Sequence, residues 1–330
     1  MVRRALVTGA TGGLGRILIP LLLESGYAVR ATGRDLIIGE RLRAQGAEFH
    51  GADLTDHDPA PLTAGMDVVF HLAALSSPWG RRETFRSINV EVTERLLASA
   101  RTAGCGAFIY ASTPSIYADC HPRLGITERD ALPPRFANQY AATKYAAECA
   151  VLAADSPGLR TMSLRPRAIV GRFDTVLFPR LLRAVRRGRM VVPGDGGALI
   201  ELTDARDVAA AFLAADRAID AAHGRAVNIS GGQPRALRVL LERIFAELDL
   251  TVALRRMPVR TALTAASLAE TIAALLPGRP EPPVTRYSVM TFAFSQTFDL
   301  SMARSLLGWQ PVHSPEDAIR DAIAGRRALA

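Results

Sequence analysis

A tyrosine and a lysine four residues apart, Tyr140 and Lys144, point most directly to chemistry. On a helix this spacing places two side chains on one face, with Cβ atoms about 5–6 Å apart. An ammonium beside a phenol would stabilise the phenolate and lower the tyrosine pKa, which suits proton exchange with a carbonyl or an alcohol. Lys144 is the only lysine in a chain rich in arginine. We therefore interpret the pair as catalytic rather than as incidental neighbours on a surface helix.

Two hydroxyl side chains, Ser112 and Thr113, follow a predicted strand over residues 107–111. Ligands of open α/β sheets bind outside the carboxyl ends of the strands. The sequence therefore places these hydroxyls where a ligand is expected.

Three glycines, Gly9, Gly12 and Gly15, lie between a short apolar strand and an apolar helical run over residues 17–23. Strand, glycine turn and helix in this order form the pyrophosphate site of a dinucleotide-binding fold. The first glycine permits the tight turn, the second the approach of the pyrophosphate, and the third close packing of helix on strand. The N-terminus of the helix supplies the anion site.

The end of the second predicted strand bears on the choice of cofactor. A fold that prefers NAD places an acidic residue there to hold the ribose 2′-hydroxyl. This chain has Gly33 followed by Arg34, whose guanidinium is suited to a 2′-phosphate. We expect NADP(H) to be preferred. NAD(H) stays open, because a one-residue shift of the turn would bring Asp35 to the ribose.

Strands and helices alternate along most of the chain, which predicts an α/β fold with a doubly wound parallel (Rossmann) sheet. We assign residues 1–170 plus 199–230 to a dinucleotide-binding domain. Residues 171–198 plus 231–330 lack the regular alternation and are assigned to a smaller substrate-binding domain. Its predicted helix over 259–276 is apolar on most faces, and three interpretations are open: a wall over the substrate cleft, core, or a membrane-surface helix.

Several motifs in the right order resemble extended short-chain dehydrogenase/reductases, the NAD-dependent epimerase/dehydratase superfamily. They include Thr8-Gly-Ala-Thr-Gly-Gly-Leu-Gly15, the Tyr140–Lys144 segment and a closing signature from Phe298 to Pro311. Within the superfamily, Ala111-Ser-Thr-Pro-Ser115, the Arg167 loop and Pro283-Val-Thr-Arg-Tyr287 resemble the 3β-hydroxysteroid dehydrogenase branch. That branch includes the bacterial 2-alkyl-3-oxoalkanoate reductases.

The resemblance implies roles for individual residues. Thr113, with Ser112, would hold the reacting oxygen, Tyr140 would exchange the proton, and Lys144 would lower the tyrosine pKa and bind the nicotinamide ribose. It implies no metal site. The cofactor-binding set that it implies, together with the glycine loop and the strand ends, is Gly9, Thr11, Gly12, Gly13, Leu14, Gly15, Arg34, Asp53, Leu54, Ala73, Ala74, Asn89, Tyr140, Lys144 and Pro166.

The implied reaction is hydride transfer between a nicotinamide and a secondary alcohol or ketone on a bulky apolar molecule, steroid-like or β-keto acid-like. A nucleotide-sugar 4-epimerase or 4-reductase is the alternative, with Arg172, Arg180 and Arg183 as candidates for holding a diphosphate. Dehydratases of this fold carry an acidic pair where this chain has Pro114-Ser115, which argues against dehydration. A third alternative is a regulator that binds dinucleotide without turnover.

Composition limits which partners and which cellular compartment we expect for this protein. The formal net charge is +8, but the arginines are scattered, so we expect no nucleic-acid partner. Three dispersed cysteines suit neither a disulfide framework nor a metal site and indicate a reducing cytoplasm. A strand predicted from residue 5 leaves no room for a signal peptide, and no apolar run is long enough to span a membrane. Membrane contact is not expected, and a homodimer is left open.

Overall fold

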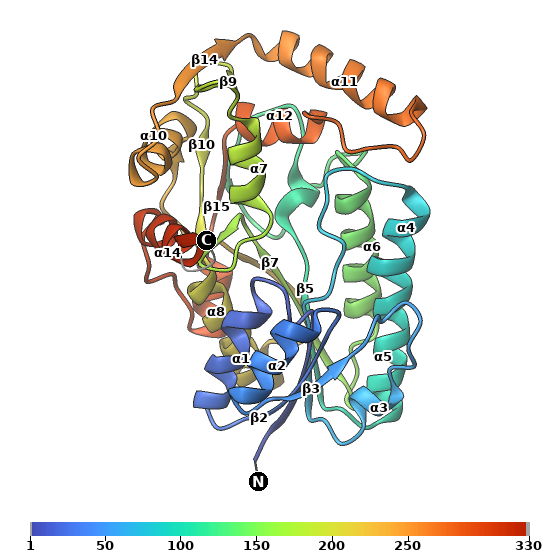
Figure 1. Cartoon of the computed structure of the whole chain (residues 1–330). Coiled ribbons are helices and arrows are strands. Elements are labelled where there is room, and N and C mark those ends of the chain that lie inside the picture. Colours follow the sequence, from blue (N-terminus) through green and yellow to red (C-terminus); the bar gives the residue numbers. More distant parts are fainter. Residues whose placement is uncertain (1, 328–330) are drawn as a thin grey trace.

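Seven parallel strands form the central sheet of the computed structural model, which describes residues 2–327 (Figure 1). Their order across the sheet is β12-β7-β5-β4-β1-β2-β3. This arrangement confirms the predicted Rossmann fold, and it brings the carboxyl ends of all seven strands to one edge. The strands are β1 (Arg4–Thr8), β2 (Ala28–Gly33), β3 (Glu48–Gly51), β4 (Val68–His71), β5 (Ala107–Ala111), β7 (Arg160–Pro166) and β12 (Arg225–Ile229).

Helices cover both faces of this sheet, as its apolar strands require. On one face α1 (Gly15–Glu24) packs beside α8 (Ala205–Arg217), and α13 (Ser301–Leu307) joins the same core. On the other face α5 (Val92–Thr102) packs beside α6 (Gln139–Ala153), with α3 (Ala60–Thr63) below them in Figure 1. Two separate hydrophobic cores therefore fix the sheet between its helices. The short helices α2 (Leu36–Ala44) and α9 (Ile219–Ala222) complete this part of the chain.

The remaining strands make small sheets above the carboxyl edge. One contains four strands in the order β13-β10-β15-β6, and two others pair β8 with β11 and β9 with β14. A third core, mostly of aliphatic and phenylalanine side chains, holds α7 (Leu177–Ala184), α10 (Leu237–Glu247) and α14 (Pro315–Arg327) together. The strands are β6 (Arg123–Ile126), β8 (Ile169–Val170), β9 (Arg189–Pro193), β10 (Leu199–Ile200), β11 (Thr203–Asp204), β13 (Arg235–Ala236), β14 (Ala253–Met257) and β15 (Gln296–Phe298). The domain boundaries proposed above stay predictions.

The predicted apolar helix forms as α11 (Val259–Leu275) and lies at the top of Figure 1, next to α12 (Arg286–Ala293). Its buried face consists of small residues such as Ala266, which packs near Val289 of α12. The large apolar residues Leu268, Ile272 and Leu275 are exposed instead. The core interpretation therefore fails for these side chains. Among residues 2–327, no helix is both long and apolar enough to cross a membrane.

From the sequence we expect a helix to begin at Asn89, but in the structure it begins earlier, so this boundary is wrong. The helix starts as α4 (Arg82–Arg86) and passes through a π-helical turn over Ser87–Glu91 before α5. Asn89 is buried inside that turn, where its side chain bonds to other parts of the chain instead of capping a helix end. π-Helical turns inside α-helices are frequent at functional sites.

Candidate active site

The predicted site residues gather along the carboxyl edge of the central sheet. The glycine loop follows β1, Arg34 follows β2, and the Ala73-Ala74 pair follows β4. Ser112 and Thr113 follow β5, and α6 carries Tyr140 and Lys144 beside them. Because parallel strands end at one edge, residues far apart in sequence become neighbours.

The glycine loop is shaped by close approaches of the backbone. Gly9 adopts a φ of +65°, and a Cβ there would lie 2.7 Å from the backbone nitrogen of Ala73. A Cβ on Gly13 would lie 2.7 Å from the carbonyl oxygen of Phe173. Helix α1 begins at Gly15, so its free N–H groups face the loop. This cradle and helix end fit the pyrophosphate of a dinucleotide.

The residues expected to read the adenosine ribose also come together. Arg34 is exposed, with 77% of its side chain accessible, and a nitrogen lies 3.6 Å from a carboxylate oxygen of Asp53. Hydrogen bonds from Thr55 lower the pKa of Asp53, so its carboxylate is charged at neutral pH. Asp35 caps α2 by accepting a hydrogen bond of 3.0 Å from the backbone N–H of Ile38. One carboxylate oxygen of Asp35 is therefore engaged within its own helix.

Asn89 ties the cofactor floor to the catalytic helix. Its side-chain oxygen accepts from the backbone N–H of Leu75 at 2.8 Å, one residue beyond Ala74. Its amide nitrogen donates to the Thr143 hydroxyl at 3.1 Å, one residue before Lys144. Asn89 therefore contacts α6 through a direct hydrogen bond to Thr143, the residue before Lys144.

The hydroxyls after β5 are buried and face the catalytic tyrosine. Thr113 donates to the Ser115 hydroxyl at 2.9 Å, and that hydroxyl lies 2.6 Å from the phenolic oxygen of Tyr287 on α12. Within the described part of the chain, the Ser112 hydroxyl has no hydrogen-bond partner. Buried polar groups are normally paired, so a free hydroxyl here suits a ligand oxygen.

The Tyr140 phenol does not have the lowered pKa expected from its lysine neighbour. Burial raises its pKa to about 12, and interactions with the hydroxyls of Thr113 and Ser76 offset only part of that rise. The expectation fails because desolvation of the phenolate dominates and Lys144 is directed elsewhere. At neutral pH the phenol is protonated and can donate its proton.

Lys144 is 1% exposed, and its ammonium lies 4.0 Å from the ring centroid of Tyr110 on β5. This cation–π contact compensates only part of the lost hydration. Burial therefore lowers the pKa of Lys144 to about 7, although the charge of Glu148 raises it somewhat. The lysine is poised to change its charge near neutral pH.

Glu148 lies one helical turn beyond Lys144 and anchors α6 to β7. It accepts two hydrogen bonds from Arg165, at 2.9 and 2.5 Å, and a third from Ser163 at 2.9 Å. Arg165 also donates to the phenolic oxygen of Tyr117. The pair is buried and fully hydrogen-bonded, so it orients the helix that carries the tyrosine and the lysine.

His71 has a structural role, as expected for a histidine at the end of a predicted strand over residues 68–72. Its Nδ1 lies 2.7 Å from the Thr8 hydroxyl and its Nε2 lies 2.9 Å from the Thr93 hydroxyl. Complete burial lowers its pKa to about 3, which keeps the ring neutral. The ring joins β1, β4 and α5 beneath the site.

Sequence reasoning missed three side chains of this site. Ser115 and Tyr287 extend the hydroxyl chain from Thr113, and Ser76 faces the Tyr140 phenol. Ser76 had a signal, because it follows the small-residue turn after β4. Tyr287 stood out only as the last residue of the Pro283–Tyr287 motif, and about 140 residues separate it from Tyr140, so the sequence did not connect the two.

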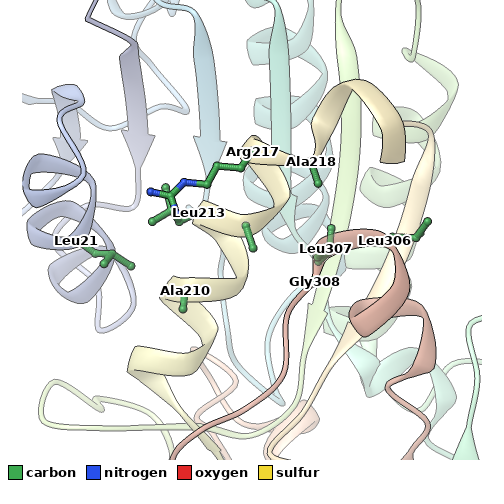
Figure 2. Close-up of a pocket in the computed structure, with 9 residues that line it drawn as sticks. Leu21, Ala210, Leu213, Arg217, Ala218, Leu306, Leu307 and Gly308 are labelled. Atoms are coloured by element: carbon green, nitrogen blue, oxygen red, sulfur yellow. The ribbon is translucent and has the colours of Figure 1, made fainter.

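A surface pocket of about 430 Å³ lies away from this site (Figure 2). It is bounded by residues of α1, α8 and α13, including Leu21, Leu213, Arg217 and Leu306. No residue of the predicted set lines it. The pocket is therefore separate from the candidate active site.

Fold and site together define a class: a dinucleotide-binding α/β enzyme with a hydroxyl, tyrosine and lysine at its carboxyl edge. Residues 5–230 match the NAD dependent epimerase/dehydratase family. The chain belongs to this family, as an extended short-chain dehydrogenase/reductase of the 3β-hydroxysteroid dehydrogenase-like branch.

Relatives extend over nearly the whole chain. The uncharacterized protein YbjS of Escherichia coli (strain K12) is 36% identical over 98% of each chain. The 2-alkyl-3-oxoalkanoate reductase of Stenotrophomonas maltophilia (strain K279a) is 34% identical over 98% of this chain and 100% of its own. Among solved structures, MoeE5 in complex with UDP-glucose and NAD is 26% identical, covers 99% of this chain and 100% of its own, and superposes with a TM-score of 0.77.

Proposed function

We propose that this protein transfers a hydride between NADP(H) and a secondary alcohol or ketone on a bulky apolar substrate. The observation that carries the proposal is the convergence of Thr113, Tyr140 and Lys144 at one edge of the sheet, with the free Ser112 hydroxyl beside them. These are the groups that a carbonyl reduction requires.

In the direction of reduction, Thr113 and Ser112 hold the carbonyl oxygen and Tyr140 donates its phenolic proton to it. In oxidation the proton of the alcohol passes to the phenolate form of Tyr140, so that direction requires the deprotonated tyrosine. A preorganised donor at the developing alkoxide stabilises the transition state. The nicotinamide, when bound, supplies or accepts the hydride. The raised phenol pKa keeps Tyr140 protonated and ready to donate near neutral pH.

Lys144 is proposed to bind the nicotinamide ribose from within α6, held there by the Glu148–Arg165 pair and by Thr143. Arg34 is proposed to hold a 2′-phosphate, because it is exposed at the end of β2 and Asp35 is engaged in capping. The proposed Arg34 contact supports NADP(H) over NAD(H), whereas the Lys144 contact would be the same for both cofactors.

An apolar substrate is supported by the relative named 2-alkyl-3-oxoalkanoate reductase. The nucleotide-sugar alternative is weakened by the arginines it would need. Arg172 is bound to Asp321 through hydrogen bonds of 3.0 and 2.8 Å, and Arg180 lies 3.4 Å from Glu281. Arg172 is therefore committed to a carboxylate, while Arg180 lies beside one without a hydrogen bond from its Nε among residues 2–327. The third candidate, Arg183, donates to the backbone carbonyl of Pro179 at 3.3 Å.

The test is Tyr140→Phe, assayed with NADPH and a series of ketones of increasing chain length. We expect turnover to fall at least about 100-fold, in line with the loss of a general acid, while NADPH affinity stays close to that of the unmodified enzyme. Near-normal turnover by the variant would exclude Tyr140 as the proton donor. Turnover of a UDP-sugar, with none of the ketones, would establish the alternative function.

A further inference from the structure

Arg167 is a buried cation with no carboxylate hydrogen-bonded to its Nε or Nη2 among residues 2–327, and the charge of Glu201 acts on it only from beyond hydrogen-bond distance. The residue is 5% exposed and follows β7 directly, at the same sheet edge as the catalytic residues. Its Nε and Nη2 atoms are buried and have no hydrogen-bond partner within residues 2–327. Buried guanidinium groups are almost never left unpaired, because burying a charge without a partner is costly.

The carboxylates and hydroxyls near Arg167 are engaged by other residues. The Glu201 carboxylate accepts a hydrogen bond from the Ser230 hydroxyl, and burial raises its pKa. Asp119, on the wall of the same cavity, accepts from the backbone N–H of His121 at 3.0 Å. The phenol of Tyr287 is bonded to Ser115. No carboxylate of the described chain lies within 4 Å of the Arg167 guanidinium.

The two free atoms lie on one edge of the guanidinium, and that edge binds carboxylates elsewhere in this protein. Arg165 uses Nε and Nη2 to hold Glu148, and Arg206 uses the same two atoms to hold Asp204. Arg3 holds Asp216 in the same way, at 2.7 and 2.6 Å. Two parallel N–H groups on this edge match the two oxygens of a carboxylate. Arg167 presents the same fork with no protein carboxylate in it.

Arg167 is linked to the hydroxyls of the candidate active site through Tyr287. Arg167 lines a small cavity together with Met290 and Thr291 of α12 and Phe294 just beyond it. Tyr287, one helical turn before Met290 and Thr291, interacts electrostatically with both Arg167 and Tyr140. Its bond to Ser115 connects this cavity to Thr113.

The backbone fixes this placement. Ala168, the next residue, has a φ of 39°, a left-handed conformation uncommon outside glycine. The carbonyl of Arg167 accepts a hydrogen bond from Thr203, and its N–H donates to Ile229 at 2.8 Å. Strained backbone held by its surroundings is concentrated at functional sites.

We infer that Arg167 binds the carboxylate of the substrate, so that the preferred substrate of the proposed oxidoreductase is a 3-oxo or 3-hydroxy acid with an apolar chain. This inference rests on the function proposed above and narrows it. A neutral steroid or simple ketone lacks the group that would fill the fork.

The cavity is too small for a diphosphate. Its free volume is about 10 Å³, roughly the room that one water-sized group takes, so only the end of a substrate would reach Arg167 there. Met290 and Phe294 form apolar parts of its wall. The two oxygens of one carboxylate also satisfy both free nitrogens at once.

The test compares two alcohols oxidised with NADP⁺: a 2-alkyl-3-hydroxyalkanoic acid and the secondary alcohol of the same chain that lacks the carboxylate. Each oxidation transfers a hydride from the alcohol to NADP⁺ and a proton from the alcohol to the Tyr140 phenolate, so the absorbance of NADPH measures the rate with both alcohols. In Arg167→Met we expect the ratio of kcat/KM, acid over neutral alcohol, to fall about 10- to 100-fold, the effect of losing hydrogen bonds to a charged group. Arg167→Lys should keep part of that preference.

Arg238→Met serves as the matched control, since it removes one exposed arginine that pairs with Glu242 on α10. Its ratio should equal that of the unmodified enzyme. A ratio that Arg167→Met leaves within about twofold would overturn the carboxylate site while leaving the proposed oxidoreductase intact. If the enzyme converts neither the two alcohols nor the corresponding ketones but does convert UDP-glucuronate, the proposed function and this inference are both wrong.

Discussion

Two arginines that stand two residues apart, Arg165 and Arg167, meet opposite conditions at the end of β7. Both are buried. Arg165 points toward α6 and is bound to Glu148 and Tyr117. Arg167 points toward the small cavity below α12, where two of its nitrogens have no partner among residues 2–327. Side chains at i and i+2 would share a face on a regular strand, but the chain leaves β7 at Pro166.

The contrast separates a structural cation from one reserved for a ligand. A buried pair with all its hydrogen bonds made holds two elements together, and breaking it costs stability. An unpaired buried cation lowers stability until a ligand supplies the missing charge. Site residues are often those that the fold leaves unsatisfied.

The largest expected effect comes from changing each arginine to methionine. Arg165→Met should lower the free energy of unfolding by about 3–5 kcal/mol, because it leaves the Glu148 carboxylate buried without a partner. Arg167→Met should cost under about 1 kcal/mol or stabilise the protein, because it removes an unpaired charge. Urea unfolding of both variants, without substrate, measures the difference. Equal destabilisation by the two substitutions would break the comparison.

A second effect concerns Lys144, another buried cation with no carboxylate bound to it. Its pKa of about 7 lies below its ordinary value, so the unfolded chain binds the proton more tightly than the folded one. Stability should therefore rise as pH increases from about 7 toward the unfolded pKa of about 10.4. Below about pH 7 the folded protein carries the full free-energy penalty of burying the charged Lys144 ammonium.

Comparison with Lys144→Met isolates that contribution. The advantage of the variant in free energy of unfolding should shrink by about 2–3 kcal/mol between about pH 6 and about pH 9. Urea unfolding at several pH values provides the measurement. A difference that stays constant with pH would mean that the lysine is not buried as a titrating charge.

A smaller effect is expected at Arg34, which is exposed where Arg167 is buried. Arg34→Ala should weaken NADPH binding by about 1.5 kcal/mol, the lower end for a charge-assisted contact, because solvent surrounds this guanidinium. NADH affinity should change little. Fluorescence titration with NADPH and with NADH measures both affinities. If the unmodified enzyme binds NADH as tightly as NADPH, the proposed preference for NADP(H) is wrong.

The smallest effect is expected on α11. Leu275 is 82% exposed, so Leu275→Ser should change stability by no more than about 0.5 kcal/mol. If the cavity at Arg167 rather than α11 sets substrate preference, kcat/KM for long-chain substrates should not change either. A loss of activity that grows with chain length would show that α11 closes over the substrate.

The features that could be predicted from the sequence all depend on residues close together in the chain. The glycine turn, the strand ends and the Tyr140–Lys144 spacing each lie within a few residues, and together they indicated the fold, the family and the edge where the site forms. Parallel topology then brings those edges together whatever the detailed packing. The structural role of His71 also followed from its place in a strand.

Only the tertiary structure decided which side chains are buried and which residues far apart in sequence contact one another. The Tyr140 pKa rises because the fold desolvates the phenol, and Lys144 rests on the ring of Tyr110 instead. The Asn89 turn is π-helical because its side chain bridges Leu75 and Thr143. The sequence identified two arginines around Pro166 but not which of them has a carboxylate. Arg165 meets a carboxylate because α6 places Glu148 beside it. Among residues 2–327, no helix or strand places a carboxylate in a salt bridge with Arg167.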